Sequence, residues 1–300
     1  MAALLVAFTV FLAWTPDISE QVLLQTYSRS GTVRIMVQQQ PVFVQDSGPR
    51  DAPVIVLLHG FGSSLQTWDE WAPALEKNWR VLRLDIPGFG LSGPAVNNDY
   101  SDAADVARVI ALLDQLGLQQ VTMAGHSMGG RIAWNLAAAH PERVSRLVLL
   151  SPDGFPGPGA QNDNTYDVPP WLGLMKYSLP RWVLRMGGVA PAFADDSQLT
   201  PPLMQRYHDM VLAPGVRTAM LERMRQTRNS DPSARLQSIQ VPVLLLWGEK
   251  DAFIPVSNAQ DYLKAMPQAK LVTLPSVGHV LHEEAPHASV QAVLGFLARP

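Results

Sequence analysis

The chain contains no cysteine, and this absence excludes several kinds of chemistry. Without thiols there are no disulfides, no thiolate nucleophile and no zinc site built on cysteine. Charged residues are also few, at 16% of 300 residues, and the formal net charge is −3. No run of Lys and Arg offsets this balance, so we expect no nucleic-acid partner.

The N-terminus lacks charge altogether, because residues 2–14 are almost wholly apolar and the first charged residue is Asp17. This stretch is shorter than the ~20 residues of a membrane-spanning helix, and it lacks the basic start and A-x-A cleavage pattern of a secretory signal. Three interpretations stay open: an atypical signal peptide, a short membrane anchor or interfacial helix, or an apolar helix packed on the protein or a partner. We treat residues 1–32 as a separate segment and expect a membrane-associated or exported protein rather than a freely cytoplasmic one. The oligomeric state is left open.

Motifs for metals and nucleotides are missing as well. Neither H-x-x-x-H nor H-E-x-x-H occurs, and Gly60-Phe61-Gly62 lacks the third glycine and the acidic partner of a dinucleotide site. His282-Glu283-Glu284 is better explained as the polar start of the last helix. We therefore expect neither a metal nor an organic cofactor.

Apolar runs of strand length alternate with helical patterns along most of the chain. Such continuous runs are typical of parallel strands that are covered on both faces. Two further short runs near residues 33–44 predict an antiparallel pair at the start. We expect an α/β fold with a mostly parallel, eight-stranded sheet flanked by helices. The central strands are predicted at 54–58, 80–85, 121–126, 144–150, 243–247 and 270–274, and helices at 68–77, 101–117, 256–266 and up to 297.

The alternation breaks at residues 154–236, which are rich in proline, methionine and aromatic residues. This block has helical patterns but no convincing strand, so it has no sheet of its own on which to pack. We predict a helical cap, inserted after the sixth strand, over the carboxyl edge of a core made of residues 33–153 and 237–300. Its helices are expected at 171–186, 202–212 and 216–227.

The strongest functional signal is the stretch Val121–Gly130, where a strand-like run ends in Gly-His-Ser-Met-Gly and a helical pattern follows at once. G-x-S-x-G between a strand and a helix is typical of a nucleophile elbow, which exposes the serine hydroxyl on a tight, strained turn. Gly125 and Gly129 are expected because a Cβ at either position would clash. Ser127 is therefore the candidate nucleophile.

A serine nucleophile needs a histidine base that is held by a carboxylate. His279 follows the last predicted strand, at the same sheet edge as Ser127, and is the candidate base. His282 is the competitor, whereas His126 must point away from the turn and His59 is expected to brace the neighbouring loop.

Asp251 follows strand 243–247 and is the candidate acid, which gives the chain order Ser, Asp, His that accompanies this elbow. Asp153 and Glu249 remain alternatives, and Asp85 is better explained as a side chain that caps its Pro/Gly loop.

Acyl transfer also requires N–H donors for the tetrahedral oxyanion. One is predicted to be the N–H of Met128, at the start of the elbow helix. The other is predicted to be the N–H of Phe61, in the loop that follows His59.

These motifs resemble, in order, those of the α/β-hydrolase fold family. The resemblance covers roughly residues 41–299 and implies nucleophile Ser127, acid Asp251, base His279 and an oxyanion hole from Phe61 and Met128. The elbow G-H-S-M-G-G is similar to those of bacterial carboxylesterases and lipases and of the membrane-anchored monoacylglycerol lipases of animals. The quoted segments are His59–Gly62, Asp85–Ser92, Gly125–Gly130, Trp247–Asp251 and Gly278-His279.

The resemblance implies hydrolysis of a small-molecule carboxylic ester through an acyl-enzyme. Haloalkane dehalogenases and epoxide hydrolases of this fold carry an aspartate where this chain has Ser127. The alternative is a carbon–carbon bond hydrolase of the meta-cleavage type, but those relatives commonly carry Asn in place of His126 and an active-site Arg.

The cap offers the only clue to the substrate. Apolar side chains there predict an uncharged acyl, aryl or acylglycerol-type ester, because ligand pockets are mostly apolar. Arg181, Arg185 and Arg206 are expected to face water. The residues predicted to line the pocket are Phe155, Trp171, Met175 and Trp182.

Overall fold

The computed structural model of the chain describes residues 14–156 and 167–298. Its centre is an eight-stranded sheet with the strand order β1-β2-β4-β3-β5-β6-β7-β8. β2 pairs antiparallel with β1 and β4, and the other neighbours are parallel, which confirms the predicted sheet. The strands are β1 (Thr32–Val37), β2 (Gln40–Ser47), β3 (Val54–Leu58), β4 (Arg80–Leu84), β5 (Val121–His126), β6 (Val144–Leu150), β7 (Val243–Gly248) and β8 (Lys270–Leu274).

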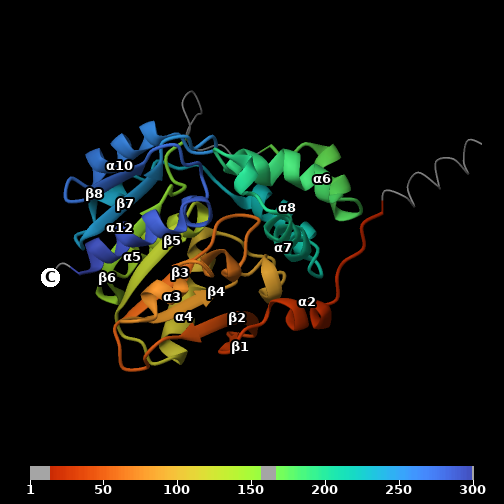
Figure 1. Cartoon of the computed structure of the whole chain (residues 1–300). Coiled ribbons are helices and arrows are strands. Elements are labelled where there is room, and N and C mark those ends of the chain that lie inside the picture. Colours follow the sequence, from red (N-terminus) through yellow and green to blue (C-terminus); the bar gives the residue numbers. More distant parts are fainter. Residues whose placement is uncertain (1–13, 157–166, 299–300) are drawn as a thin grey trace, which may run out of the picture.

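Helices cover both faces of the sheet and gather as a cap at one side of the molecule, where α6, α7 and α8 lie together (Figure 1). The described helices are α2 (Glu20–Tyr27), α3 (Ala72–Leu75), α4 (Asp102–Gln115), α5 (Met128–Ala139), α6 (Arg181–Leu184), α7 (Pro201–Val211), α8 (Val216–Gln226), α9 (Ser233–Gln237), α10 (Ala259–Ala265), α11 (Leu281–Glu284) and α12 (Pro286–Leu297).

Alternate side chains of the central strands supply two separate hydrophobic cores. In β6, Leu147 and Leu149 share a core with residues of α4, α5 and α10. Val148 and Leu150 belong to a second core, with residues of α3 and α12. Because both faces are covered, β5 and β7 are buried at every position, which explains why residues of these strands are mostly apolar.

Between β6 and β7, the regular structure of the described residues is helical, so the predicted cap helices are present. The single helix expected over 171–186 is instead divided into a 3-10 helix (Pro170–Lys176), α6 and a π-helical turn (Arg185–Val189). Pro180 precedes α6, and a proline lacks the N–H that a continuing helix needs.

Two other predicted helices are shorter than expected. The pattern over 68–77 forms a 3-10 turn (Leu65–Trp68) followed by the single turn of α3, which has Pro73 in its first turn. The last helical pattern is split into α11 and α12, and Pro286 is the first residue of α12.

Residues 14–19 run along the cap before α2 begins (Figure 1). The N–H of Thr15 donates to the carbonyl of Tyr177 at 2.9 Å, and the N–H of Ile18 donates to that of Leu212 at 2.8 Å. The N-terminal segment is thereby hydrogen-bonded to two separate parts of the cap.

The roles predicted for residues 2–14 concern a stretch that, apart from Trp14, lies outside the described residues. Within 14–156 and 167–298, no helix combines the length and apolar character needed to span a bilayer. α2 follows the N-cap Ser19 and buries Leu23 in the larger core, so this helix packs on the body of the protein.

Candidate active site

Ser127 occupies the turn between β5 and α5 with φ of 52° and ψ of −118°. Such a backbone costs a non-glycine residue about 1–3 kcal/mol and persists only where its surroundings enforce it. A Cβ on Gly125 would lie 2.2 Å from the oxygen of Gly129, and a Cβ on Gly129 would lie 2.3 Å from that of Leu58. The N–H of Ser127 also donates to the carbonyl of Leu150 at 3.0 Å. The tight turn expected from the sequence is therefore present and is held by close packing.

Asp251 and His279, from the loops after β7 and β8, form a buried pair. Nδ1 of His279 lies 2.8 Å from Oδ2 of Asp251, and the side chain of Asp251 is completely buried. The other carboxylate oxygen accepts the N–H groups of Phe253 (2.9 Å) and Ile254 (2.8 Å). An ionised carboxylate only accepts hydrogen bonds, so Nδ1 carries the proton and Nε2 is free to act as a base.

The main chain around His279 is fastened to the cap. Its N–H donates to the carbonyl of Ala192 at 2.7 Å. The carboxylate of Glu284 accepts the N–H groups of Ala194 (2.9 Å) and Gly278 (2.6 Å), one in the cap and one beside the histidine. The sequence did not predict this role of Glu284, because the residue was interpreted only as part of the polar start of the last helix.

The rival carboxylates bind other partners. Oδ2 of Asp153 accepts a hydrogen bond from Arg131 at 3.4 Å, and the main-chain N–H of Asp153 donates to the carbonyl of Ser127 at 3.0 Å. Glu249 is exposed and accepts the hydroxyl of Thr273 at 2.8 Å. Of the three carboxylates weighed as the acid, the structure brings Asp251 to the histidine.

Asp85 is a buried loop cap, as the sequence suggested. Its two oxygens accept the N–H groups of Leu65 (2.7 Å) and Leu91 (2.8 Å). Burial raises the pKa of Asp85 to about 7, although both N–H groups act in the opposite direction. The side chain thus joins two loops beside the site.

His59 braces the loop that carries Phe61. Its Nε2 accepts the N–H of Ile86 at 3.0 Å, which leaves Nδ1 to donate to the carbonyl of Gly60 at 2.7 Å. Complete burial lowers the pKa of His59 to about 4, so the ring is neutral at physiological pH. Both ring nitrogens are occupied, which excludes His59 as the base.

The rings of His126, His279 and His282 form one buried group, in which the ring of His126 lies 4.5 Å from that of His279 and 4.6 Å from that of His282, tilted by more than 50° to each. Nε2 of His126 donates to the carbonyl of His279 at 2.9 Å. Nε2 of His282 lies 2.8 Å from the hydroxyl of Thr67, on the far side of this group. Burial lowers the pKa of His282 to about 4 and that of His126 well below its usual range. The rings of His126 and His282 are therefore neutral and pack in the group that contains His279.

Arg206 corrects a prediction, since this side chain is mostly covered, with 15% of it exposed, instead of facing water. It donates to the carbonyl of Gln66 at 3.0 Å and pairs closely with Glu283, which also accepts the hydroxyls of Tyr207 and Thr67. Burial alone would raise the pKa of Glu283, but the guanidinium of Arg206 outweighs it and keeps that pKa below its usual value. The expected polar start of the last helix thus takes part in a largely buried ionic cluster with Arg206 of α7. Arg181 and Arg185 are surface residues that bond Gln205 and Asp196.

The two predicted oxyanion donors belong to the loop after β3 and to the start of α5. Met128 is the first residue of α5, where the unpaired N–H groups of a helix and its dipole favour negative charge. Both Met128 and Phe61 line the same cavity as Ser127. Within the described part of the chain, neither main-chain N–H donates to a protein acceptor.

A cavity of about 500 Å³ lies between Ser127 and the cap. His279 and Phe253 form part of its wall on the sheet side, and the cap contributes Leu184, Val189 and Tyr207. Met220 and Met224 of α8 complete a mostly apolar lining. None of the described residues that line it is Lys or Arg.

The four pocket residues predicted from the sequence are not among those that line this cavity. Trp171 and Trp182 are 68% and 65% exposed and face solvent. Phe155 packs edge-on against Tyr262, at 5.0 Å between ring centroids, and Met175 packs on the main core. The prediction is wrong because apolar character alone does not say which side of a thin cap a residue occupies.

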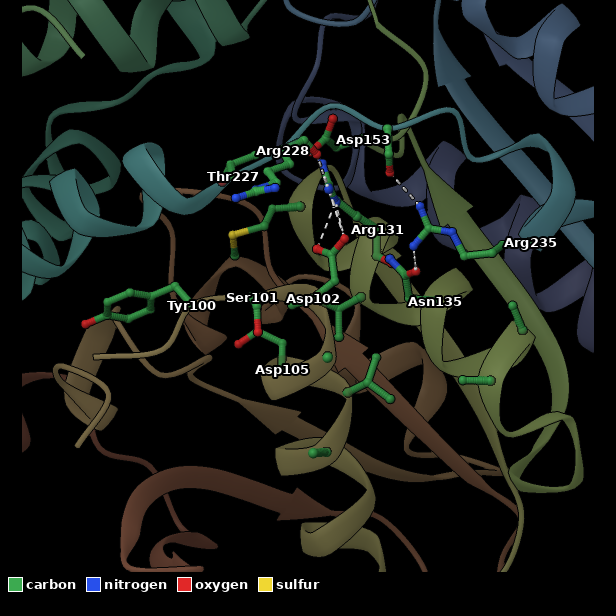
Figure 2. Close-up of a pocket in the computed structure, with 18 of the residues that line it drawn as sticks. Tyr100, Ser101, Asp102, Asp105, Arg131, Asn135, Asp153, Thr227, Arg228 and Arg235 are labelled. Carbon is green, nitrogen blue, oxygen red and sulfur yellow. Dashed lines mark hydrogen bonds and ion pairs between the residues drawn. The ribbon is translucent and has the colours of Figure 1, made fainter. Parts of the chain in front are cut away.

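A second, larger cavity of about 1090 Å³ lies beside the first, and Figure 2 shows its charged lining. Arg131 points across it toward Asp102, which accepts two bonds at 2.9 Å, and also contacts Asp153. Burial would lower the pKa of Arg131, but Asp153 and Asp102 outweigh this effect and raise it. Met128, Asp153 and Thr227 line both cavities, so Asp153 is part of the polar wall between them.

A strained serine after β5, a carboxylate after β7 and a histidine after β8, on a parallel sheet beneath a helical cap, define the class of the α/β hydrolases. The chain belongs to the alpha/beta hydrolase fold family, whose sequence profile matches residues 53–286. It is therefore a hydrolase of this fold.

Individual relatives differ in what they are named for. The chain is 32% identical over 248 residues to the dihydrolipoyllysine-residue acetyltransferase component of the acetoin cleaving system of Pseudomonas putida; the match covers 82% of this chain and 63% of that protein. It is 30% identical to a 2-hydroxy-6-oxononadienedioate/2-hydroxy-6-oxononatrienedioate hydrolase of a Pseudomonas species, over 86% of this chain and 92% of the relative. Among solved structures, a membrane phospholipase A described as a bacterial virulence factor superposes with a TM-score of 0.74 at 26% identity, covering 99% of this chain and 91% of the other.

Proposed function

We propose that this hydrolase cleaves carboxylic esters with apolar acyl groups, through an acyl-enzyme on Ser127. The observation that carries the proposal is the pairing of Asp251 with His279 at 2.8 Å, in the wall of the cavity that also contains the strained serine. A base that is oriented in this way and lines the same cavity as a serine hydroxyl is suited to nucleophilic acyl transfer.

In the first half of the reaction, the hydroxyl oxygen of Ser127 attacks the ester carbonyl carbon while Nε2 of His279 takes its proton. The carbonyl π electrons move to oxygen, and the oxyanion accepts the N–H groups of Phe61 and Met128. Loss of one such donor typically costs about 10²–10³ in rate. The tetrahedral intermediate then collapses, the ester C–O bond breaks, and His279 protonates the departing alkoxide.

In the second half, water attacks the acyl-enzyme and His279 takes a proton from it. A second oxyanion forms at the same donors and collapses to release the carboxylic acid, with the proton returned to Ser127. Throughout, Asp251 keeps the ring of His279 in the tautomer that leaves Nε2 unprotonated and stabilises the imidazolium.

The cavity supports an uncharged acyl group as the substrate portion. Its lining includes Leu184, Met220, Met224 and Phe253, and methionine side chains adapt to acyl groups of different shape. The similarity to a membrane phospholipase A supports a lipid-like or acylglycerol-type ester. We also propose that the apolar residues 2–14 associate with a membrane.

The second candidate is a carbon–carbon bond hydrolase that uses the same triad. Its support is the 30% identical relative, whose named dienedioate substrate is a dianion at neutral pH. Against it stands the cavity, which has no Lys or Arg among its described lining residues to bind a carboxylate. Arg131, which contacts the cavity residue Asp153, is already paired with two carboxylates, those of Asp102 and Asp153.

The test is a comparison of turnover on an ester series and on a meta-cleavage dienoate. Wild type should hydrolyse short and medium acyl esters, and Ser127→Ala should lose at least about 10³-fold in kcat. Ser145→Ala, at the opposite end of β6 from the site, is the matched control and should retain activity. Ester turnover by Ser127→Ala equal to that of wild type would contradict the mechanism. Faster turnover of the dienoate than of every ester would favour the carbon–carbon bond hydrolase.

A further inference from the structure

An exposed row of large apolar side chains follows the 3-10 helix Pro170–Lys176 on the outside of the cap. Trp171 and Leu174 are 68% and 66% exposed, and Tyr177, which ends the helix, is 56% exposed. A 3-10 helix has three residues per turn, so residues three apart eclipse one another. The three side chains therefore lie along one edge of the helix and face solvent.

The next segment of the cap has an inner and an outer side. Leu184 and Val189 line the active-site cavity. Trp182 and Met186, one turn apart, are 65% and 69% exposed on the other side. The outer apolar side chains are thus separated from the substrate cavity by the thickness of a single helical segment.

The N-terminus enters the described structure at the same place. Trp14 is 53% exposed, and its ring lies 6.0 Å from that of Tyr177. The bond from Thr15 to the carbonyl of Tyr177 fixes this approach. The preceding residues 2–13 carry no charge and are almost wholly apolar, so an apolar segment leaves the described structure beside the exposed aromatic rings.

The charge of this region also differs from that of the whole chain. Residues 168–194 contain Lys176, Arg181 and Arg185 and no acidic residue, although the net charge of the chain is −3. Arg181 bonds only the neutral amide of Gln205 among the described residues, and Arg185 forms an exposed pair with Asp196. Basic side chains that flank exposed Trp and Tyr are typical of surfaces that lie in the headgroup region of an anionic bilayer.

We propose that this outer cap surface docks on an anionic lipid bilayer and opens the substrate cavity toward it. Trp and Tyr favour the headgroup region, where their rings are partly buried and their polar groups stay hydrated. The inference deepens the proposed ester hydrolase by naming the lipid surface as the source of its substrate. The outer cap surface consists of Trp14, Trp171, Leu174, Tyr177, Trp182 and Met186.

The charges favour a bilayer over a second copy of the chain as the occupant. A twofold dimer through this surface would bring the same face of each copy together. Lys176 and Arg181 of one copy would then approach those of the other, and like charges repel in a closed interface. Anionic lipid headgroups instead supply the opposite charge.

The test is co-sedimentation of the full chain with vesicles of phosphatidylcholine and phosphatidylglycerol, using Ser127→Ala so that binding is measured without turnover. Combined replacement Leu174→Ser, Trp182→Ser and Met186→Ser should weaken vesicle binding at least about tenfold, because apolar area leaves the bilayer. Residual binding is expected from the apolar N-terminus. Turnover of a small soluble ester by the triple variant, carrying the native Ser127, should be unchanged.

A matched control carries serine at three apolar positions that are exposed elsewhere, Val33, Met36 and Val96, and should bind vesicles as wild type does. Lys176→Glu with Arg181→Glu should remove the preference for phosphatidylglycerol over pure phosphatidylcholine. Vesicle binding by the triple variant equal to that of wild type would overturn the proposal. If wild type forms a dimer without vesicles, and the triple variant loses the dimer but still binds vesicles as wild type does, the proposal would be overturned, and the occupant of the surface would be a second copy of the chain.

Discussion

The main-chain N–H of His279 donates to the carbonyl oxygen of Ala192, with 2.7 Å between the two atoms. Ala192 belongs to the cap, whereas His279 follows the last strand of the sheet. The position of the proposed base is therefore set by both layers of the molecule. Changes in the cap should affect turnover even where they do not touch the substrate.

Glu284→Ala should lower kcat about tenfold and change KM little, because it releases the loop that holds His279 from the cap. Glu284 accepts N–H groups from Ala194 and Gly278, and misplacement of a catalytic group by about 1 Å can cost 10²-fold. Steady-state kinetics on a small ester measure the effects on kcat and on KM separately. Glu284→Gln, which keeps an acceptor oxygen, should recover part of the loss, and the exposed Glu249→Ala should retain full activity. Equal losses for Glu249→Ala and Glu284→Ala would contradict this positioning role.

The two candidate acids can be separated by conservative replacement. Asp251→Asn should reduce kcat by about 10⁴, because an amide can hold His279 in the wrong tautomer. Asp153→Asn should cost less than about tenfold, since its carboxylate pairs with Arg131 and not with the base. Both variants should keep their fold, as checked by circular dichroism. A larger loss for Asp153→Asn would identify Asp153 as the acid.

Stability should fall as the pH decreases from 6.5 toward 4. Burial lowers the pKa of His282 to about 4, so in this window the unfolded chain takes up a proton that the folded chain does not. That difference contributes stability above pH 6.5, and it is lost as the pH falls through the folded pKa. The contribution is roughly 3 kcal/mol at most. The free energy of unfolding, measured with urea at several pH values, should depend less steeply on pH in His282→Gln than in wild type. The exposed His287→Gln should keep the pH dependence of wild type.

The length of the acyl group should depend on the methionines of α8. Met224→Trp fills part of the cavity and should lower kcat/KM for an octanoyl ester at least about tenfold more than for an acetyl ester. Met224→Leu conserves the volume and should leave the preference unchanged. A uniform loss on both esters would indicate a general distortion of the site instead of a narrower cavity.

The sheet and the elbow could be predicted because their signals are local. Residues of β5 and β7 are buried at every position and mostly apolar, and the Gly-His-Ser-Met-Gly motif lies within one turn of the chain. The contact that requires Gly125 is also local, whereas Gly129 is required by its close approach to Leu58 of β3. The pairing of Asp251 with His279 was also accessible, because both follow strands of one parallel sheet and must meet at its carboxyl edge.

The cap and its anchors could not be predicted in the same way. Trp171 and Trp182 are large and apolar, as pocket residues often are, yet they are 68% and 65% exposed, because apolar character alone does not say which side of the cap a residue occupies. Arg206 and Glu283 are charged, which favours solvent, but each is neutralised by the other in a contact between positions 77 residues apart. The acidic pair Glu283-Glu284 next to Pro286 was the one available signal that the final helix begins later.

The most direct test of the proposed mechanism is identification of the residue that forms the acyl-enzyme. The folded, full-length chain would be treated with a fluorophosphonate, which traps activated serines, and the adduct would be located by peptide mass spectrometry. A single adduct on Ser127, reduced at least about 10³-fold in rate by His279→Ala and absent from Ser127→Ala, is predicted. Labelling at another serine, or a rate that does not depend on His279, would contradict the assignment.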